Sequence, residues 1–181
     1  IFDEATIRIT AVQALVERLV GILDQGGYPA EEACMIAKIH ASDLLWETAD
    51  DLVQMLGGRG FMENNPAAQI LRDCRMLRIG EGANELMTLS VGRRVLHSEP
   101  LRTLMRDSLG APALYEQMCE VAKETMARCL ATEHHFGGRG DAVAWAHTLT
   151  GRVAIEALML AVIEAADGAE SAAGLAAARD W

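Results

Sequence analysis

The sequence predicts an all-α protein, an antiparallel helix bundle with further helices appended after it. Hydrophobic residues make up 51% of the 181 residues but aromatic residues only 4%, a balance that favours helices packed on helices over a sheet. Apolar residues recur three and four positions apart in several long segments, which is the spacing of one helix face. Glycines and prolines separate these segments, and we find no alternating pattern that predicts a strand.

The first two predicted helices span residues 3–25 and 29–56. Gly26 and Gly27 end the first, and Pro29 suits the first position of the second. The expected buried stripe of the first helix is Val12, Leu15, Val16, Leu19, Val20 and Leu23. The expected stripe of the second is Ile36, Ile39, Leu45, Leu52, Val53 and Leu56, and Gly57-Gly58 then stops the helix.

Residues 57–82 are rich in glycine and predict a winding connection with one short helix near 67–72. A third long helix is expected over 83–97. Ser98-Glu99-Pro100 then closes the segment and is the candidate domain boundary. The predicted organisation is therefore a bundle domain over residues 1–97 and a helical extension over residues 98–181.

The extension is expected to hold helices at 101–107, 111–133, 141–166 and 170–180, with a glycine-rich loop at 136–140. Its apolar faces are Leu114, Met118, Val121 and Leu130, and Leu149, Val153, Leu158 and Ile163. We interpret them as a second helical layer that closes the fold. The alternative, a membrane-surface or partner contact, is less favoured because an acidic chain suits anionic lipid poorly.

Charge and cysteine spacing exclude several classes of function. The net charge of −10 argues against nucleic-acid binding, because phosphate contacts need clustered Lys and Arg. The four cysteines lie far apart without a CxxC pair, and the adjacent His134-His135 has no thiol nearby, so no metal site is predicted. No apolar run is long enough to span a bilayer, and no signal peptide is recognisable. The expected location is the bacterial cytoplasm or an organellar matrix, not outside the cell.

Residues 54–87 carry the candidate chemistry. The cluster Gly57-Gly58-Arg59-Gly60 follows a helix, so a helix C-cap explains it; alternatively, glycines let a ligand approach the backbone closely. Glu81 lies between two glycines just before a predicted helix. It is either a capping acid, or a buried carboxylate with a raised pKa that removes a proton. Arg72-Asp73 is either an exposed ion pair or, as we favour, a clamp within the bundle.

The ordered set of these residues resembles the C-terminal signature of the acyl-CoA dehydrogenases. The matching residues are Gln54, Gly57, Gly58, Gly60, Phe61, Pro66, Arg72, Asp73, Ile79, Glu81, Gly82, Asn84, Glu85, Leu86 and Met87. The resemblance covers about residues 1–97. The extension is similar, less specifically, to the additional C-terminal region of very-long-chain acyl-CoA dehydrogenases.

This resemblance implies an oxidoreductase of fatty acid β-oxidation, a flavoprotein that uses FAD. Glu81 would remove the α proton of an acyl-CoA while the β hydride passes to the flavin, giving a trans-2-enoyl-CoA. Electrons would then pass to an electron-transfer flavoprotein. Gln54, Gly57 and Gly58 match positions that contact the ADP part of FAD held by a neighbouring subunit, and Ala83 and Glu85 match positions near the flavin. A homodimer or homotetramer is the expected assembly.

The sequence departs from the family pattern in two ways. Ala83 replaces a frequent threonine and offers no hydroxyl to the cofactor. The chain begins with Ile1, at what resembles the second helix of the family's bundle, so we expect a piece of a longer or split enzyme that is inactive alone. Three alternatives stay open: a non-catalytic dimerisation or scaffold domain, an oxidase or an enzyme of carrier-protein thioesters, and a base on an upstream helix.

Overall fold

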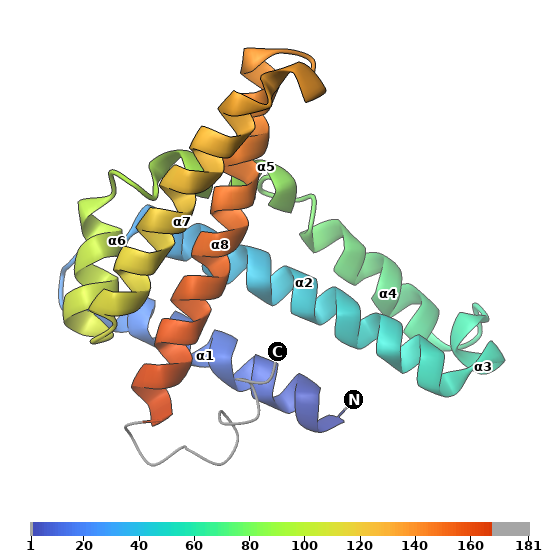
Figure 1. Cartoon of the computed structure of the whole chain (residues 1–181). Helices are drawn as coiled ribbons and strands as arrows, with labels where there is room; N and C mark the ends of the chain where they lie inside the picture. The colour runs from blue at the N-terminus through green and yellow to red at the C-terminus, as the bar shows by residue number, and fades with distance from the viewer. Residues whose placement is uncertain (1, 168–181) are drawn as a thin grey trace.

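The computed structural model describes residues 2–167, which form helices and the loops between them, with no strand in that range (Figure 1). The α-helices are α1 (Phe2–Asp24), α2 (Glu31–Leu56), α3 (Gly58–Phe61), α4 (Pro66–Leu77), α5 (Asn84–Arg94), α6 (Glu99–Thr103), α7 (Pro112–Ala131) and α8 (Arg139–Asp167). A π-helix, η1 (Leu104–Ser108), follows α6, and a 3-10 turn, η2 (Glu133–His135), follows α7. The all-α prediction is therefore confirmed.

The helices form two crossing groups. Helix α2 packs on α1 and on α4, and α3 lies at the far end of the α2–α4 pair. We call α3, α4 and the C-terminal half of α2 the arm. Helices α7 and α8 form a hairpin that crosses the layer made by α1 and α2. Helix α5 lies against both α2 and α8 (Figure 1). Helix α5 therefore connects α2 to the hairpin.

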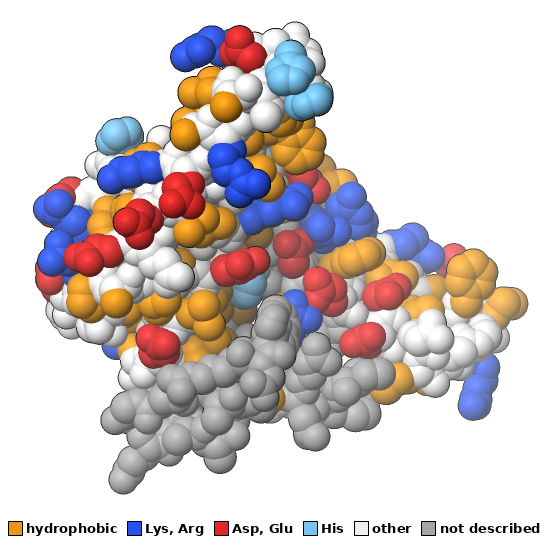
Figure 2. Space-filling model, in the orientation of Figure 1, with side chains coloured by type: hydrophobic (Ala, Val, Ile, Leu, Met, Phe, Trp, Pro, Cys, Tyr) orange, Lys and Arg blue, Asp and Glu red, His pale blue; other side chains and the backbone are white. Residues whose placement is uncertain are grey.

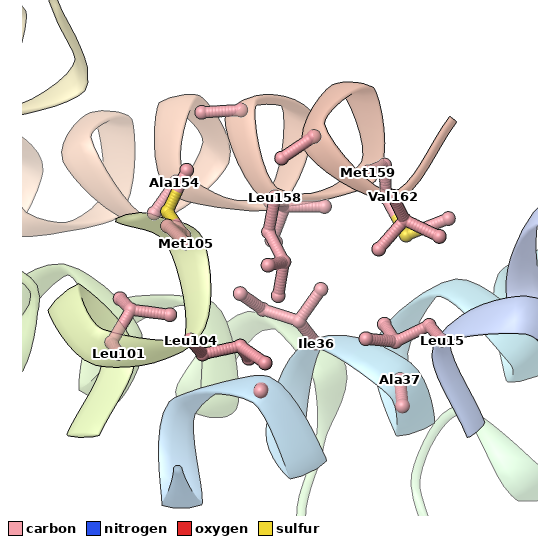
Figure 3. Packing of buried hydrophobic residues seen from close by; sticks show 14 of the residues in the cluster. Leu15, Ile36, Ala37, Leu101, Leu104, Met105, Ala154, Leu158, Met159 and Val162 are labelled. Carbon is pink, nitrogen blue, oxygen red and sulfur yellow. The ribbon is translucent and has the colours of Figure 1, made fainter. Parts of the chain in front are cut away.

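One hydrophobic cluster joins both groups (Figure 3). Leu158 of α8 lies above Ile36 of α2, and Leu15 of α1 lies on the same inner side; all three side chains are fully buried. Leu101 and Met105, which follow Ser98 in the chain, are buried in the same cluster. The division of the chain after residue 97 stays a prediction, because the core itself is shared by residues on both sides.

Helices α5 and α8 cross with their backbones in contact. A Cβ added at Gly92 of α5 would lie 1.8 Å from the carbonyl oxygen of His147. One added at Gly151 of α8 would lie 2.0 Å from the carbonyl oxygen of Thr88. Only glycine fits at both positions, so this crossing fixes where α5 sits on the hairpin.

The predicted helices agree with the structure except in the connection after α2 and in the π-helical turn after α6. Residues 57–82 hold two helices where one was predicted, and α4 covers Pro66–Leu77 instead of 67–72. Helix α4 is well capped, since Asn65 Oδ1 accepts a hydrogen bond from the N–H of Ala67 at 3.0 Å and Pro66 occupies the first turn. The helix predicted for 170–180 lies outside the described residues.

Parts of the predicted buried stripes were wrong. Val16, Val20 and Leu23 are 41%, 46% and 53% exposed, because α1 contacts its neighbours mainly through Val12, Leu15 and Leu19. In α2, Leu45 is 43% exposed, and Leu52, Val53 and Leu56 are only half-buried. These residues lie where α2 passes into the arm and packs on α3 and α4. Leu149 of α8 is also exposed.

Candidate functional site

The loop between α4 and α5 carries Glu81 in a left-handed backbone conformation. The N–H groups of Ile79 and Gly80 complete α4 by bonding the carbonyl of Met76 at 3.0 and 2.8 Å. Glu81 then has φ +58°, the single non-glycine residue with positive φ among those described, and Gly82 has φ +112°. For a residue with a Cβ this conformation costs about 1–2 kcal/mol. Surrounding contacts must therefore hold it.

Asn84 ties the end of this loop to α2. Its side chain is buried, and its Nδ2 donates to Ser42 Oγ and to Asp43 Oδ1, both at 2.9 Å. Its Oδ1 accepts from Lys38 Nζ at 2.8 Å. Its backbone N–H closes the loop by donating to the carbonyl of Arg78 at 3.1 Å. The amide of Asn84 thus fixes the first turn of α5 on α2.

Lys38 and Arg78 hold the rest of the loop. Lys38 Nζ donates to the carbonyl oxygen of Gly82 at 2.8 Å, the residue directly after Glu81. Arg78 Nε donates to Asp43 Oδ1 at 2.5 Å, and its guanidinium carbon lies 4.8 Å from the centre of the Trp46 ring. Charged hydrogen bonds of this kind are stronger than neutral ones. The loop is therefore anchored to α2 before, within and after the glutamate.

The Glu81 side chain itself is exposed and has no hydrogen-bond or ion-pair partner within residues 2–167. The expectation of a buried glutamate was therefore wrong for this chain. The reason is that the loop turns its backbone, not this side chain, toward α2. The capping alternative also receives no support, because Ala83 is the N-cap of α5 and no side chain caps that end.

A half-open groove of about 570 Å³ runs beside the loop between α1, α2, α5 and α8. Arg78, Asn84 and Glu85 form its end nearest the loop, and polar and apolar residues of α1, α2, α5 and α8 line the remainder. His40 lies in its wall, where burial, and secondly the charge of Arg8, lower the pKa of the imidazole. Figure 2 shows Lys and Arg side chains beside Asp and Glu side chains over the face it draws. At the loop itself, Arg78 and Asp43 form such an ion pair.

The candidate cofactor residues form two separate groups. Gln54, Gly57 and Gly58 are exposed where α2 passes into α3, at the far end of the arm. Ala83 and Glu85 adjoin Glu81 at the other end of α4, and Glu85 lines the groove. A helix of twelve residues separates the groups, which is roughly 18 Å of rise. The described residues therefore do not bring the two groups into one site.

The glycines at the tip of the arm differ in what the chain requires of them. Gly57 has φ +58° and ends α2, as the C-cap interpretation expects. A Cβ at Gly60 would lie 2.8 Å from the carbonyl oxygen of Val53, so α3 packs on α2 only with glycine there. At Gly58, by contrast, an added Cβ meets nothing within 4 Å. The fold of this chain gives no reason for glycine at position 58.

Arg72 does not form a clamp within the bundle. Its guanidinium makes a bidentate contact with Glu63, at 2.9 and 3.1 Å, between exposed side chains. The favoured interpretation of Arg72-Asp73 was therefore wrong. The pairing partner lies just ahead of α4, where a surface ion pair of this kind contributes about 0–1 kcal/mol.

Sequence reasoning missed Lys38, Ser42 and Asp43 as supports of the loop. A signal was present, since Lys38 and Ser42 are four residues apart on a predicted helix and share a face. That spacing alone does not show which loop the face would meet.

No helix in the described range is both long and apolar enough to cross a membrane.

The comparisons with known proteins concern the part of the chain that holds this loop. Residues 2–96 match the family described as "Acyl-CoA dehydrogenase, C-terminal domain". The cyclohexane-1-carbonyl-CoA dehydrogenase of Geobacter metallireducens is 35% identical over 96 residues, which cover 53% of this chain and 25% of that protein.

Two further relatives have similar overlap. The mitochondrial very long-chain specific acyl-CoA dehydrogenase of Mus musculus is 35% identical over 95 residues, 50% of this chain and 14% of that protein. An acyl-CoA dehydrogenase of Bacillus subtilis is 37% identical over 94 residues, 52% of this chain and 24% of that protein. The chain thus spans a quarter or less of the length of these curated relatives.

Proposed function

Because the chain belongs to the acyl-CoA dehydrogenase family, we propose that it is the C-terminal helical part of an FAD-dependent dehydrogenase of acyl-CoA thioesters. In this proposal Glu81 is the base. Its carboxylate takes the α proton of the thioester as the α C–H bond breaks. The electron pair of the α C–H bond becomes the new C=C bond of a trans-2-enoyl-CoA. Bound FAD would supply the acceptor for the β hydrogen, which leaves as hydride with the electron pair of its C–H bond.

The conformation of Glu81 is the observation that carries this proposal. Glu81 has a left-handed backbone on a loop that is bonded to α2 at three places, and no residue of the described range contacts its side chain through a hydrogen bond or ion pair. The strained conformation therefore lowers the stability of the fold, and no interaction of the side chain offsets that loss. A carboxylate held ready for a partner outside the chain explains that cost. The water-excluding surroundings that a proton-abstracting carboxylate needs must then come from substrate and from other parts of the enzyme.

The candidate cofactor residues fit FAD in part. Glycine at position 58 leaves exposed backbone open to a close approach, and Gln54 beside it offers an exposed amide. The start of α5 offers free N–H groups near Glu81, but Ala83 offers no hydroxyl there. Since the two groups lie at opposite ends of α4, we propose that the Gln54 group contacts FAD held by a neighbouring subunit.

The assembly and location remain parts of the same proposal. A homodimer or homotetramer would cover apolar side chains that α1 leaves exposed, such as Val16 and Val20. The electron-transfer flavoprotein is the proposed electron acceptor, and the cytoplasm or an organellar matrix the proposed compartment. We expect the purified chain, which spans a quarter or less of its relatives, to show no acyl-CoA-dependent turnover alone.

The test compares Glu81→Gln with the parent in the full-length product of the coding region. Acyl-CoAs of several chain lengths are added without oxygen, and flavin bleaching is followed by absorbance. We expect bleaching to be lost in Glu81→Gln while FAD stays bound, because the amide cannot accept the proton. Glu120→Gln, which removes an exposed carboxylate from α7, is the matched control and should bleach normally.

Each other outcome has a definite meaning. Bleaching that survives in Glu81→Gln would move the base to another residue. A parent protein that binds no flavin and does not bleach would instead support a dimerisation or scaffold domain without chemistry. The absent hydroxyl at Ala83 is the feature of this chain that favours that second candidate.

A further inference from the structure

We propose that Lys38 is a positioning residue for the base, an inference that rests on the proposed function of Glu81. Its ammonium group holds the carbonyl of Gly82 and thereby keeps Glu81 in its left-handed conformation. Lys38 does not touch the substrate in this proposal. It acts through the backbone of the loop.

The geometry of the contact supports this role. Lys38 is half-buried on α2, and its Nζ lies 2.8 Å from both Gly82 O and Asn84 Oδ1. An ammonium has three donors, so these two bonds leave one. The Gly82 carbonyl belongs to the peptide that follows Glu81 and Gly82, the two residues with positive φ. Fixing that carbonyl removes the freedom by which the loop would relax to an ordinary conformation.

Lys38 differs from the other anchors of the loop in what it bonds. Asn84 remains attached to Ser42 and Asp43 without it, and Arg78 remains attached to Asp43. Both of those anchors lie outside the turn itself. Among the described residues, Lys38 is the side chain that hydrogen-bonds to the backbone between Arg78 and Asn84, at the carbonyl of Gly82. Its loss should therefore free Gly82 and Glu81 while α5 stays in place.

The chain offers a matched control for this lysine. It contains two lysines, Lys38 and Lys123, and Lys123 is exposed on α7. Lys38→Met removes the donors and keeps the length of the stem. Lys38→Arg keeps a charged donor, and Lys123→Met removes an equivalent charge away from the loop.

The kinetic experiment uses the full-length product of the coding region with the same anaerobic acyl-CoA assay. We expect Lys38→Met to slow flavin bleaching at saturating acyl-CoA about 10- to 100-fold, since a displaced catalytic group loses rate on that scale. The acyl-CoA concentration for half-maximal rate should change little. Lys38→Arg should recover part of the rate, and Lys123→Met should match the parent.

Glu81→Gln, measured beside these variants, separates the two hypotheses. If Glu81→Gln is inactive while Lys38→Met bleaches at the parental rate, the role of Lys38 is refuted and the proposed function stands. If Glu81→Gln bleaches like the parent, the proposed function fails, and the role of Lys38 fails with it.

A second measurement needs no flavin and uses this chain by itself. The NOE between the amide proton and the α proton of Glu81 is strong only at positive φ and so reports its conformation, and amide exchange of Asn84 reports its bond to the Arg78 carbonyl. We expect Lys38→Met to move Glu81 out of the left-handed region while Asn84 stays protected. An unchanged Glu81 NOE overturns the inference. Should Lys38→Met fail to fold, Lys38→Gln takes its place in both experiments.

Discussion

Helix α5 is held in two contrasting ways. Its first residue, Asn84, is hydrogen-bonded to polar side chains of α2, and the loop before it is bonded by Lys38 and Arg78. Eight residues further on, Gly92 lies against the backbone of α8 with no room for a single carbon atom. One attachment consists of directed polar bonds, and the other of close contact between two helix backbones.

The difference shows that the contacts that fix the position of α5 are distinct from those that hold the candidate site. A close-packed crossing admits no added atom, so it fixes the position of a helix and fails when it is altered. A neutral hydrogen bond contributes about 0.5–1.5 kcal/mol net and one to a charged group about 1.5–3 kcal/mol, and several of both kinds together hold the loop. Changes at the crossing should therefore affect the stability of the whole chain, whereas changes at the loop should affect mainly the conformation of Glu81.

The largest predicted effect is at the crossing. Gly92→Ala places a Cβ against the carbonyl of His147, so α5 and α8 must move apart and the core between them must repack. We expect the free energy of unfolding to fall by about 3 kcal/mol, at the upper end of overpacking effects. Gly151→Ala should cost a similar amount. Urea unfolding followed by circular dichroism measures both.

Gly21→Ala is the control for this substitution. It is also a glycine within a helix, but an added Cβ there meets nothing within 4 Å. Alanine should therefore stabilise the protein by about 0.5–1 kcal/mol through helix propensity. If Gly92→Ala and Gly21→Ala changed stability alike, the close crossing would not exist in solution.

A smaller effect of opposite sign is predicted at the loop. Glu81→Gly removes a left-handed strain of about 1–2 kcal/mol but adds about 0.5–1 kcal/mol of backbone entropy to the unfolded chain. The net expectation is a stabilisation of up to about 1.5 kcal/mol together with complete loss of flavin bleaching in the full-length product. Thermal unfolding and the anaerobic assay measure the two results.

The same substitution at Glu120 is the comparison. Glu120 is exposed in the middle of α7, where glycine should cost about 1 kcal/mol of helix stability and leave bleaching unchanged. A loss of stability at both positions would mean that Glu81 is not strained. The difference in sign is thus the specific mark of a residue kept in an unfavourable conformation.

The two attachments of α5 also differ in how far the sequence could predict them. Helical periodicity, with glycine and proline at the ends, predicted α1, α2, α5, α7 and α8, and the signature residues led to the Glu81 loop. These features depend on residues that are close together in the sequence. The crossing of Gly92 with Gly151 depends on two distant glycines meeting, and neither has a neighbourhood that marks it as a contact.

Burial was the least predictable property for the same reason. Val16 and Leu45 have the spacing of core residues, yet both are exposed because no described helix covers their side of α1 or α2. Periodicity reports that a face is apolar, not what it meets. The exposure of Glu81 and the surface pairing of Arg72 with Glu63 likewise depended on which partners the fold supplies.

The smallest predicted effect lies in the groove between the two attachments, where His40 is half-buried. Burial and the charge of Arg8 lower the pKa of His40, whereas Asp43 and Glu47 oppose them more weakly. Below the ordinary pKa of 6.5 the unfolded chain therefore binds a proton that the folded chain does not. Stability should fall as the pH drops below 6.5 and should not depend on His40 above that value.

His40→Gln tests this expectation because it removes the imidazole and keeps a polar side chain. Unfolding midpoints are measured from pH 7.5 down to the onset of acid unfolding. We expect the variant to lose less stability than the parent as the pH falls, whereas His97→Gln, at an exposed histidine, should keep the part of the slope that His40 supplies. Parallel pH profiles for the parent and His40→Gln would show that the groove leaves His40 open to water, and so that α5 and α8 lie less tightly around it than the glycine crossing requires.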